Sequence, residues 1–144
     1  MIDCFKIIAI TFIVYYFYTI ILFIFGLIKT SIVKKTSNQL IPVSIIVAVR
    51  NGEKSLPKLL EALIQQSYLG LMEFIIVDDE SYDQTKQIIN KWQRKDDRIK
   101  YQTSLKGDSK LKYKKRALDA GIKIAKNNFF IFTDVDCWPT KDWI

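Results

Sequence analysis

Residues 43–49 read VSIIVAV, a nearly continuous apolar run rich in β-branched side chains. Such a run is typical of a strand that is buried on both faces, as in a parallel sheet. Leucine and isoleucine then recur at 56, 59, 60, 63 and 64, which is the spacing of one helix face. A second apolar run, FIIV, follows at 74–77. This first β-α-β unit predicts a parallel sheet that is covered by helices.

The same alternation continues along the rest of the chain. The pattern predicts a second helix around 85–92, a short strand at 99–102, a third helix around 117–125 and a last strand at 129–133. Strands that alternate with helices imply right-handed crossovers and a mostly parallel sheet. The sequence therefore predicts an α/β domain over residues 42–144, in which ligands bind beyond the carboxyl ends of the strands.

Hydrophobic residues make up 49% of the 144 residues, and they are concentrated near the N-terminus. Residues 7–28 carry no charge, and roughly 20 apolar residues suffice to cross a bilayer. We interpret them as a transmembrane helix that follows a short tail (1–6) and precedes a juxtamembrane linker (29–41). A cleaved signal peptide is the alternative, but the run is long for one and no small-residue cleavage pattern follows it.

Lysines flank this helix unequally. Lys29, Lys34 and Lys35 follow it, whereas Lys6 precedes it and is opposed by Asp3. The positive-inside rule places the C-terminal side in the cytoplasm. We therefore expect a single-pass protein of the cell membrane whose soluble part faces the cytoplasm.

The composition excludes several kinds of chemistry. The chain has no histidine, which excludes histidine zinc sites and Ser-His or Cys-His catalytic pairs within it. Its two cysteines, Cys4 and Cys137, do not make a disulfide framework. No G-x-G-x-x-G follows the first strand, which argues against a dinucleotide oxidoreductase.

Acidic residues follow two of the predicted strands, although the net charge is +7. Asp78 and Asp79 come after the second strand, and Asp134 and Asp136 come after the last one. Carboxylates held together repel each other unless a cation lies between them. The i, i+2 spacing of Asp134 and Asp136 points both to one side of an extended chain, where Mg²⁺ or Mn²⁺ would accept their oxygens. The alternative is a solvated turn with a helix cap at Asp136.

The loop after the second strand has a structural explanation as well. Ser81 and Gln84 match a capping box for the second helix, and Asp83 is another candidate cap. Capping does not require two carboxylates at the strand end. We therefore expect one of Asp78 and Asp79 to accept hydrogen bonds from a base or ribose, and the other to brace the loop.

Positive charge gathers between residues 86 and 126, where 14 lysines and arginines face four aspartates. Nucleic-acid binding, contact with anionic lipid and plain solvated helix faces all fit this pattern. The cluster Lys114-Lys115-Arg116 lies at the start of the third predicted helix, where cations oppose the helix dipole. A bound polyphosphate nearby would explain it, and an exposed patch is the alternative.

Four motifs together resemble a known family. PVSIIVAVRNGEKSLPKLLEALIQQSY, FIIVDDESYDQT, KKRALDAGI and FIFTDVDCWP closely resemble the N-terminal half of family 2 glycosyltransferases, over about residues 42–144. The resemblance implies a partial GT-A fold, a nucleotide-diphospho-sugar donor that is usually UDP-linked, and a divalent metal, Mg²⁺ or Mn²⁺. It also implies inverting transfer of the sugar to a glycan or lipid-linked acceptor.

The resemblance further implies roles for particular residues. Those expected to line the nucleotide pocket are Asn51 and the backbone around Val49 and Arg50. Asp79, with Asp78, is expected to bind the base and ribose, and Lys114 to approach the donor. Asp134 and Asp136 match the D-x-D motif, with Asp136 the better candidate for direct metal ligation.

This chain departs from the family pattern in three places. Gly52 stands where an acid often follows the asparagine, with the acid delayed to Glu53, and Tyr113 stands where a glycine often precedes the lysine. The catalytic base and the acceptor half are expected beyond Ile144, so we predict that this chain does not turn over alone. The alternative is a non-catalytic membrane-bound nucleotide-sugar binder or partner subunit, and no nucleic-acid partner is expected.

Overall fold

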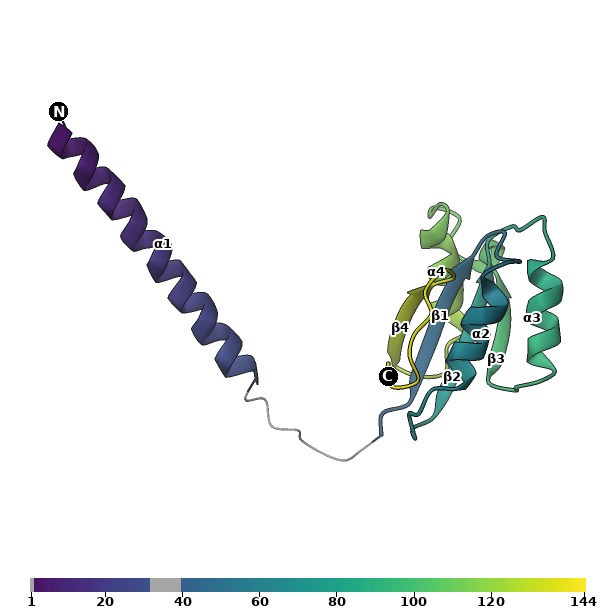
Figure 1. The fold of residues 1–144 in the computed structure, drawn as a ribbon. Coiled ribbons are helices and arrows are strands. Elements are labelled where there is room, and N and C mark those ends of the chain that lie inside the picture. The colour runs from purple at the N-terminus through teal and green to yellow at the C-terminus, as the bar shows by residue number, and fades with distance from the viewer. Residues whose placement is uncertain (1, 32–39) are drawn as a thin grey trace. The chain divides into compact units, whose positions relative to one another are not determined.

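The computed structural model describes residues 2–31 and 40–144 (Figure 1). The chain divides into two compact units, Met1–Gln39 and Leu40–Ile144, and each is described by itself. The second unit begins within two residues of the start at 42 that the sequence predicts.

The first unit contains a single long helix in its described part, α1 (Ile2–Ser31). Its stretch Cys4–Ile28 has a mean hydropathy of 2.5 and is long and apolar enough to cross a membrane. Residues 2–6, expected to be a tail, belong to this helix, because nothing before residue 7 breaks helical hydrogen bonding. The linker expected at 29–41 falls mainly on residues 32–39, which lie outside the described residues.

The second unit is built on a four-stranded sheet with the order β3-β2-β1-β4. Its strands are β1 (Val43–Val49), β2 (Met72–Asp78), β3 (Ile99–Thr103) and β4 (Phe129–Asp134). Every neighbouring pair is parallel. The predicted α/β class with a parallel sheet is therefore confirmed.

Helices cover both faces of this sheet (Figure 1). Side chains alternate between faces along a strand, so Ile45 and Val47 of β1 pack with α2 (Leu56–Ile64) and α3 (Thr85–Gln93). Ile46 points to the opposite face and packs with Ala117 and Ala120 of α4 (Lys114–Ile124). Burial on both faces explains why β1 and β2 read as unbroken apolar runs.

Element boundaries differ from the predictions in a few places. β2 extends from Met72 to Asp78, because its whole length pairs with β1, whereas β3 pairs with it only from Phe74 to Asp78. A short 3₁₀ helix, η1 (Ser104–Lys106), was not predicted, since one turn carries no periodic signal. β4 pairs with β1 alone, and its Phe129, Phe130 and Phe132 are exposed.

Candidate nucleotide-sugar site

The strand register brings the predicted acidic residues to one edge of the sheet. Val49 of β1 lies opposite Asp78 of β2, and Ala48 lies opposite Asp134 of β4. Because all strands are parallel, their carboxyl ends meet at this edge, as expected for a ligand site in an α/β sheet. The loops that follow the three strands surround an open pocket of about 330 Å³.

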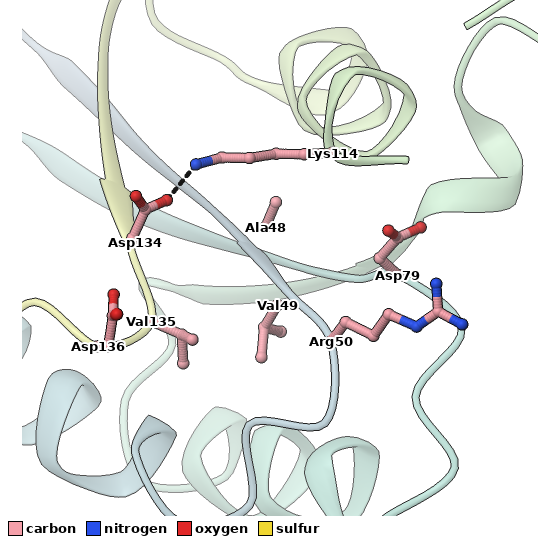
Figure 2. A pocket seen from close by; sticks show the side chains of 8 residues that line it. All are labelled: Ala48, Val49, Arg50, Asp79, Lys114, Asp134, Val135 and Asp136. Atoms are coloured by element: carbon pink, nitrogen blue, oxygen red, sulfur yellow. Dashed lines mark hydrogen bonds and ion pairs between the residues drawn. The ribbon is translucent and has the colours of Figure 1, made fainter. Parts of the chain in front are cut away.

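Six of the eight predicted site residues line this pocket (Figure 2). They are Val49, Arg50, Asp79, Lys114, Asp134 and Asp136. Ala48 and Val135 line it too and were not predicted. Both are small apolar neighbours of predicted residues, and the sequence carries no signal that separates such wall residues from core residues.

Asn51 and Asp78 lie outside the pocket lining. The backbone N–H of Asn51 donates to Ser81 Oγ (2.9 Å), and Asn51 Oδ1 accepts from the N–H of Tyr82 (3.1 Å). Asp78 is buried, and its Oδ1 accepts from the N–H of Ser81 (3.0 Å). Both side chains therefore hold the loop after β2, while Asp79 is left at the pocket.

The expected capping box is wrong. Ser81 Oγ is taken by Asn51, and the N–H of Gln84 donates to Glu53 Oε2 instead (3.3 Å). Asp83 does act at the start of α3, because its Oδ1 accepts from both the N–H (3.0 Å) and the hydroxyl (2.5 Å) of Thr85. A spacing pattern does not reveal that a second loop competes for the same groups.

These contacts interlock the loops that follow β1 and β2. The N–H of Gly52 donates to Thr85 Oγ1 (2.8 Å), and the N–H of Glu53 donates to Asp83 Oδ2 (3.0 Å). Burial raises the pKa of Asp83, but hydrogen bonds from the hydroxyl and N–H of Thr85 and from Glu53 outweigh this and leave the pKa below its usual value. These hydrogen bonds therefore hold the loops that follow β1 and β2 together in the absence of a ligand.

Gly52 is required by its surroundings. A Cβ at this position would lie 2.3 Å from Val49 Cγ2 and 3.2 Å from Val135 Cγ2. An acidic side chain does not fit there. This explains why the acid follows one residue later at Glu53, whose carboxylate reaches the start of α3.

Among residues 2–31 and 40–144, three residues other than glycine have positive φ, and all three lie in loops at this edge. They are Asn51 (55°), Glu80 (56°) and Tyr113 (53°). This backbone conformation costs an ordinary side chain about 1–3 kcal/mol and is often found at functional sites. Tyr113 occupies the position where the family often has glycine, and its φ shows why glycine suits it.

A second pocket of about 370 Å³ adjoins the first and shares Arg50 and Asp79 with it. Its other lining residues are Glu80, Ser109, Leu111, Lys112, Tyr113 and Arg116. Two arginines and a lysine here face two carboxylates.

Charge in the first pocket is partly paired. Lys114 of α4 forms an ion pair and hydrogen bond with Asp134 Oδ1 (Figure 2). Asp136 is exposed, and within the described residues its carboxylate has no hydrogen bond or ion pair. The N–H of Cys137 donates to the carbonyl of Asp134 (3.1 Å) in a turn, and no helix begins in residues 137–144. The alternative that Asp136 caps a helix is therefore wrong.

The carboxylates can be tested for fit to a divalent cation. No group of three or more histidine, cysteine, aspartate or glutamate residues in the described part of the chain is placed to hold a metal. Asp134 and Asp136 offer two carboxylates at one pocket. Mg²⁺ is commonly held by one or two carboxylates together with substrate phosphates and water. The pair therefore fits a metal that arrives with a diphosphate.

The fold and these motifs define a family. The chain belongs to glycosyl transferase family 2, whose model matches residues 44–144. The 4,4'-diaponeurosporenoate glycosyltransferase of Staphylococcus haemolyticus (strain JCSC1435) is 35% identical over 94 residues, which is 65% of this chain and 24% of that protein.

Solved structures agree with this assignment. S. aureus TarS 1-349 in complex with UDP is 31% identical, with a TM-score of 0.57, over 71% of this chain and 29% of that one. Mannosyltransferase PcManGT from Pyrobaculum calidifontis, in complex with GDP-Man and Mn²⁺, has a TM-score of 0.61 over 72% of this chain and 30% of that one. At 22% identity the second likeness shows the fold alone. The chain spans less than a third of each of these relatives.

Proposed function

We propose that this chain is the membrane-anchored donor-binding part of a family 2 glycosyltransferase. The donor is a nucleotide-diphospho-sugar, and UDP is the nucleotide we favour. The convergence of Asp79, Lys114, Asp134 and Asp136 on one pocket carries this proposal. The 31% identity to TarS, which was solved with UDP, supports the choice of nucleotide.

Each pocket residue has a distinct task in this proposal. Asp79 accepts hydrogen bonds from the base or ribose hydroxyls, and Asp78 and Asn51 keep its loop in place. The ammonium group of Lys114 binds a phosphate oxygen. Asp134 and Asp136 would hold Mg²⁺ or Mn²⁺. The metal would neutralise the negative charge that develops on the diphosphate as the sugar departs. The reaction is inverting transfer to a glycan or lipid-linked acceptor.

Among the residues that the structure describes, we assign none as a general base. Inverting transfer requires a carboxylate that takes the proton of the acceptor hydroxyl. Asp142 is the next acid after Asp134 and Asp136, and its Oδ1 accepts a hydrogen bond from Ser67 Oγ (2.6 Å) in the loop that follows α2. We therefore expect the chain alone to bind the donor without turnover. A non-catalytic nucleotide-sugar binder or partner subunit is the second candidate. The contact between Asp142 and Ser67, which leaves Asp142 without a role as a base, favours it.

Membrane anchoring through α1 and a cytoplasmic site are parts of the proposal. The apolar stretch Cys4–Ile28 is long enough to span, and lysines at 29, 34 and 35 predict a cytoplasmic C-terminal side. Nucleotide sugars made in the cytoplasm would then reach the pocket directly.

Titration calorimetry of the full chain in detergent tests the donor site. UDP should bind in the presence of Mn²⁺, and chelation of the metal or Asp136→Asn should weaken binding by about tenfold or more, since a charge-assisted contact is lost. Asp142→Asn is the matched control and should bind like the wild type. Equal UDP affinity with and without metal would contradict the metal assignment, and salt-sensitive binding of an oligonucleotide without UDP binding would overturn the proposal.

A further inference from the structure

A strongly basic segment lies beside the pocket, and the donor site accounts for only part of its charge. Residues 105–116 read LKGDSKLKYKKR, and we call this segment the basic loop. It has six basic residues against one acidic residue, Asp108, for a net charge of +5. It runs from η1 into the first turn of α4.

The basic loop is clamped onto α4. Gly107 lies so close to the carbonyl of Arg116 that a Cβ would be 2.1 Å from that oxygen. The N–H of Asp108 donates to Asp119 Oδ2 (2.7 Å), and Arg116 Nη2 donates to the carbonyl of Leu105 (3.2 Å). The charges are therefore displayed on a preformed surface.

Apolar side chains are exposed among these charges. Leu105 is 53% exposed and Tyr113 is 75% exposed. The lysines at 106, 110, 112, 114 and 115 are exposed as well. Basic residues interleaved with exposed leucine and tyrosine are typical of surfaces that lie on anionic membranes, where the cations meet headgroups and the apolar groups enter the interface.

The donor accounts for only part of this charge. Lys114 lines the first pocket, and Lys112 and Arg116 line the adjoining one. Lys106, Lys110 and Lys115 line neither of these two pockets, and Lys110 and Lys115 line a further hollow of about 480 Å³. A nucleotide diphosphate that binds in the first two pockets with a divalent cation does not need these three further lysines.

We propose that the basic loop binds the surface of an anionic bilayer and so holds the mouth of the pocket toward the membrane. This inference rests on the proposed membrane anchor. The exposed apolar side chains of Leu105 and Tyr113, together with the membrane anchor that α1 would provide, favour a membrane over nucleic acid. A lipid-linked acceptor would then meet the pocket at the bilayer surface.

Lysine acetylation of the full chain, reconstituted into vesicles and mapped by mass spectrometry, tests this contact. Vesicles of neutral phosphatidylcholine are compared with vesicles that also contain phosphatidylglycerol. Acetylation of Lys110, Lys112 and Lys115 should fall at least about threefold in the anionic vesicles, because each lysine adds about fivefold to affinity for such a surface. High salt should remove the protection. Lys86 and Lys91 on α3 are internal controls and should be unchanged.

A pair of charge-reversal variants makes the test specific. Lys106→Glu with Lys110→Glu should restore acetylation of Lys112 and Lys115 to the rate in neutral vesicles, whereas Lys86→Glu with Lys91→Glu should not. Equal acetylation in both vesicle types would overturn the inference, as would protection of Lys100 and Lys126 at the amino ends of the strands instead. UDP binding, measured separately in detergent, reports on the donor site, so failure of one proposal is distinguishable from failure of the other.

Discussion

The ammonium group of Lys114, in the first turn of α4, pairs with the carboxylate of Asp134 at the end of β4. Both side chains are more than half exposed, at 56% and 54%. Ion pairs of this exposure contribute only about 0–1 kcal/mol, so the pair is readily exchanged for stronger partners. In the proposed donor complex, Asp134 would hold the metal and Lys114 would bind a phosphate.

The variant Lys114→Met distinguishes the role of Lys114 as the partner of Asp134 from its role in binding a phosphate. Removal of the cation should raise the affinity for Mn²⁺ alone by up to about fivefold, because Asp134 no longer has a competing partner. The affinity for UDP with Mn²⁺ should fall by about tenfold, because a charge-assisted contact to phosphate is lost. Calorimetry measures both, with Lys115→Met as the control. A fall in both affinities would show that Lys114 does not compete with the metal.

Gly52→Ala should destabilise the domain by about 1–3 kcal/mol, because the new methyl group overlaps Val49 Cγ2. Urea unfolding in detergent, followed by tryptophan fluorescence, measures the loss. The double variant with Val49→Ala frees the space and should lose less than the sum of the two single changes. Strict additivity would mean that the two positions do not clash.

Tyr113→Gly should stabilise the domain by about 1 kcal/mol, since glycine adopts a φ of 53° without steric cost. The unfolded chain gains entropy from glycine, which limits the benefit. Tyr113→Ala removes the same ring without relief of strain, and it should not stabilise. The same urea experiment compares them, and equal stabilities for the two variants would exclude backbone strain at this position.

Acid should weaken the link between α2 and the turn that precedes β3. Arg98 donates from Nη2 to Asp96 Oδ2 (2.7 Å) and to the carbonyl of Ile64 (3.2 Å). The hydrogen bond from Arg98 lowers the pKa of Asp96, and burial opposes this effect without cancelling it. A carboxylate with a lowered folded-state pKa stabilises the fold above its unfolded value of about 3.9, and this contribution is lost as the pH falls through the folded-state pKa.

Asp96→Asn should therefore reduce stability at pH 7 by about 1 kcal/mol and have a smaller effect once the pH has fallen through the lowered folded-state pKa of Asp96. Urea midpoints measured from pH 2 to 7 give the comparison. Asp97→Asn, one residue along, is the control. A stability difference that does not change across this range would show that the charge of Asp96 is not involved.

Buried apolar runs made most of the fold predictable. The bounds of β1 and α2 match the predictions, because nearly every side chain of β1 is buried and the buried leucines of α2 recur at helical spacing. Asp79, Asp134 and Asp136 could be placed at one edge because parallel strands end together. The helix predicted around 117–125 was expected to have the cluster Lys114-Lys115-Arg116 at its start, and α4 begins at Lys114.

The partners within the loops could not be predicted in this way. Asn51 and Ser81 are 30 residues apart, yet their hydrogen bond (2.9 Å) takes the serine away from the helix that it was expected to cap. Several donors and acceptors of similar strength compete in each loop. The choice among them depends on how closely two loops approach, which no local pattern records.

The amino-acid sequence by itself determined the order of strands and helices, the parallel sheet and the edge at which acidic groups gather, because burial imposes a period on the chain. Only the tertiary structure decided that Asn51 and Asp78 hold a loop while Asp79 lines the pocket, and that Lys114 meets Asp134. Those contacts join segments that are distant in sequence, so their geometry exists only once the helices have packed on the sheet.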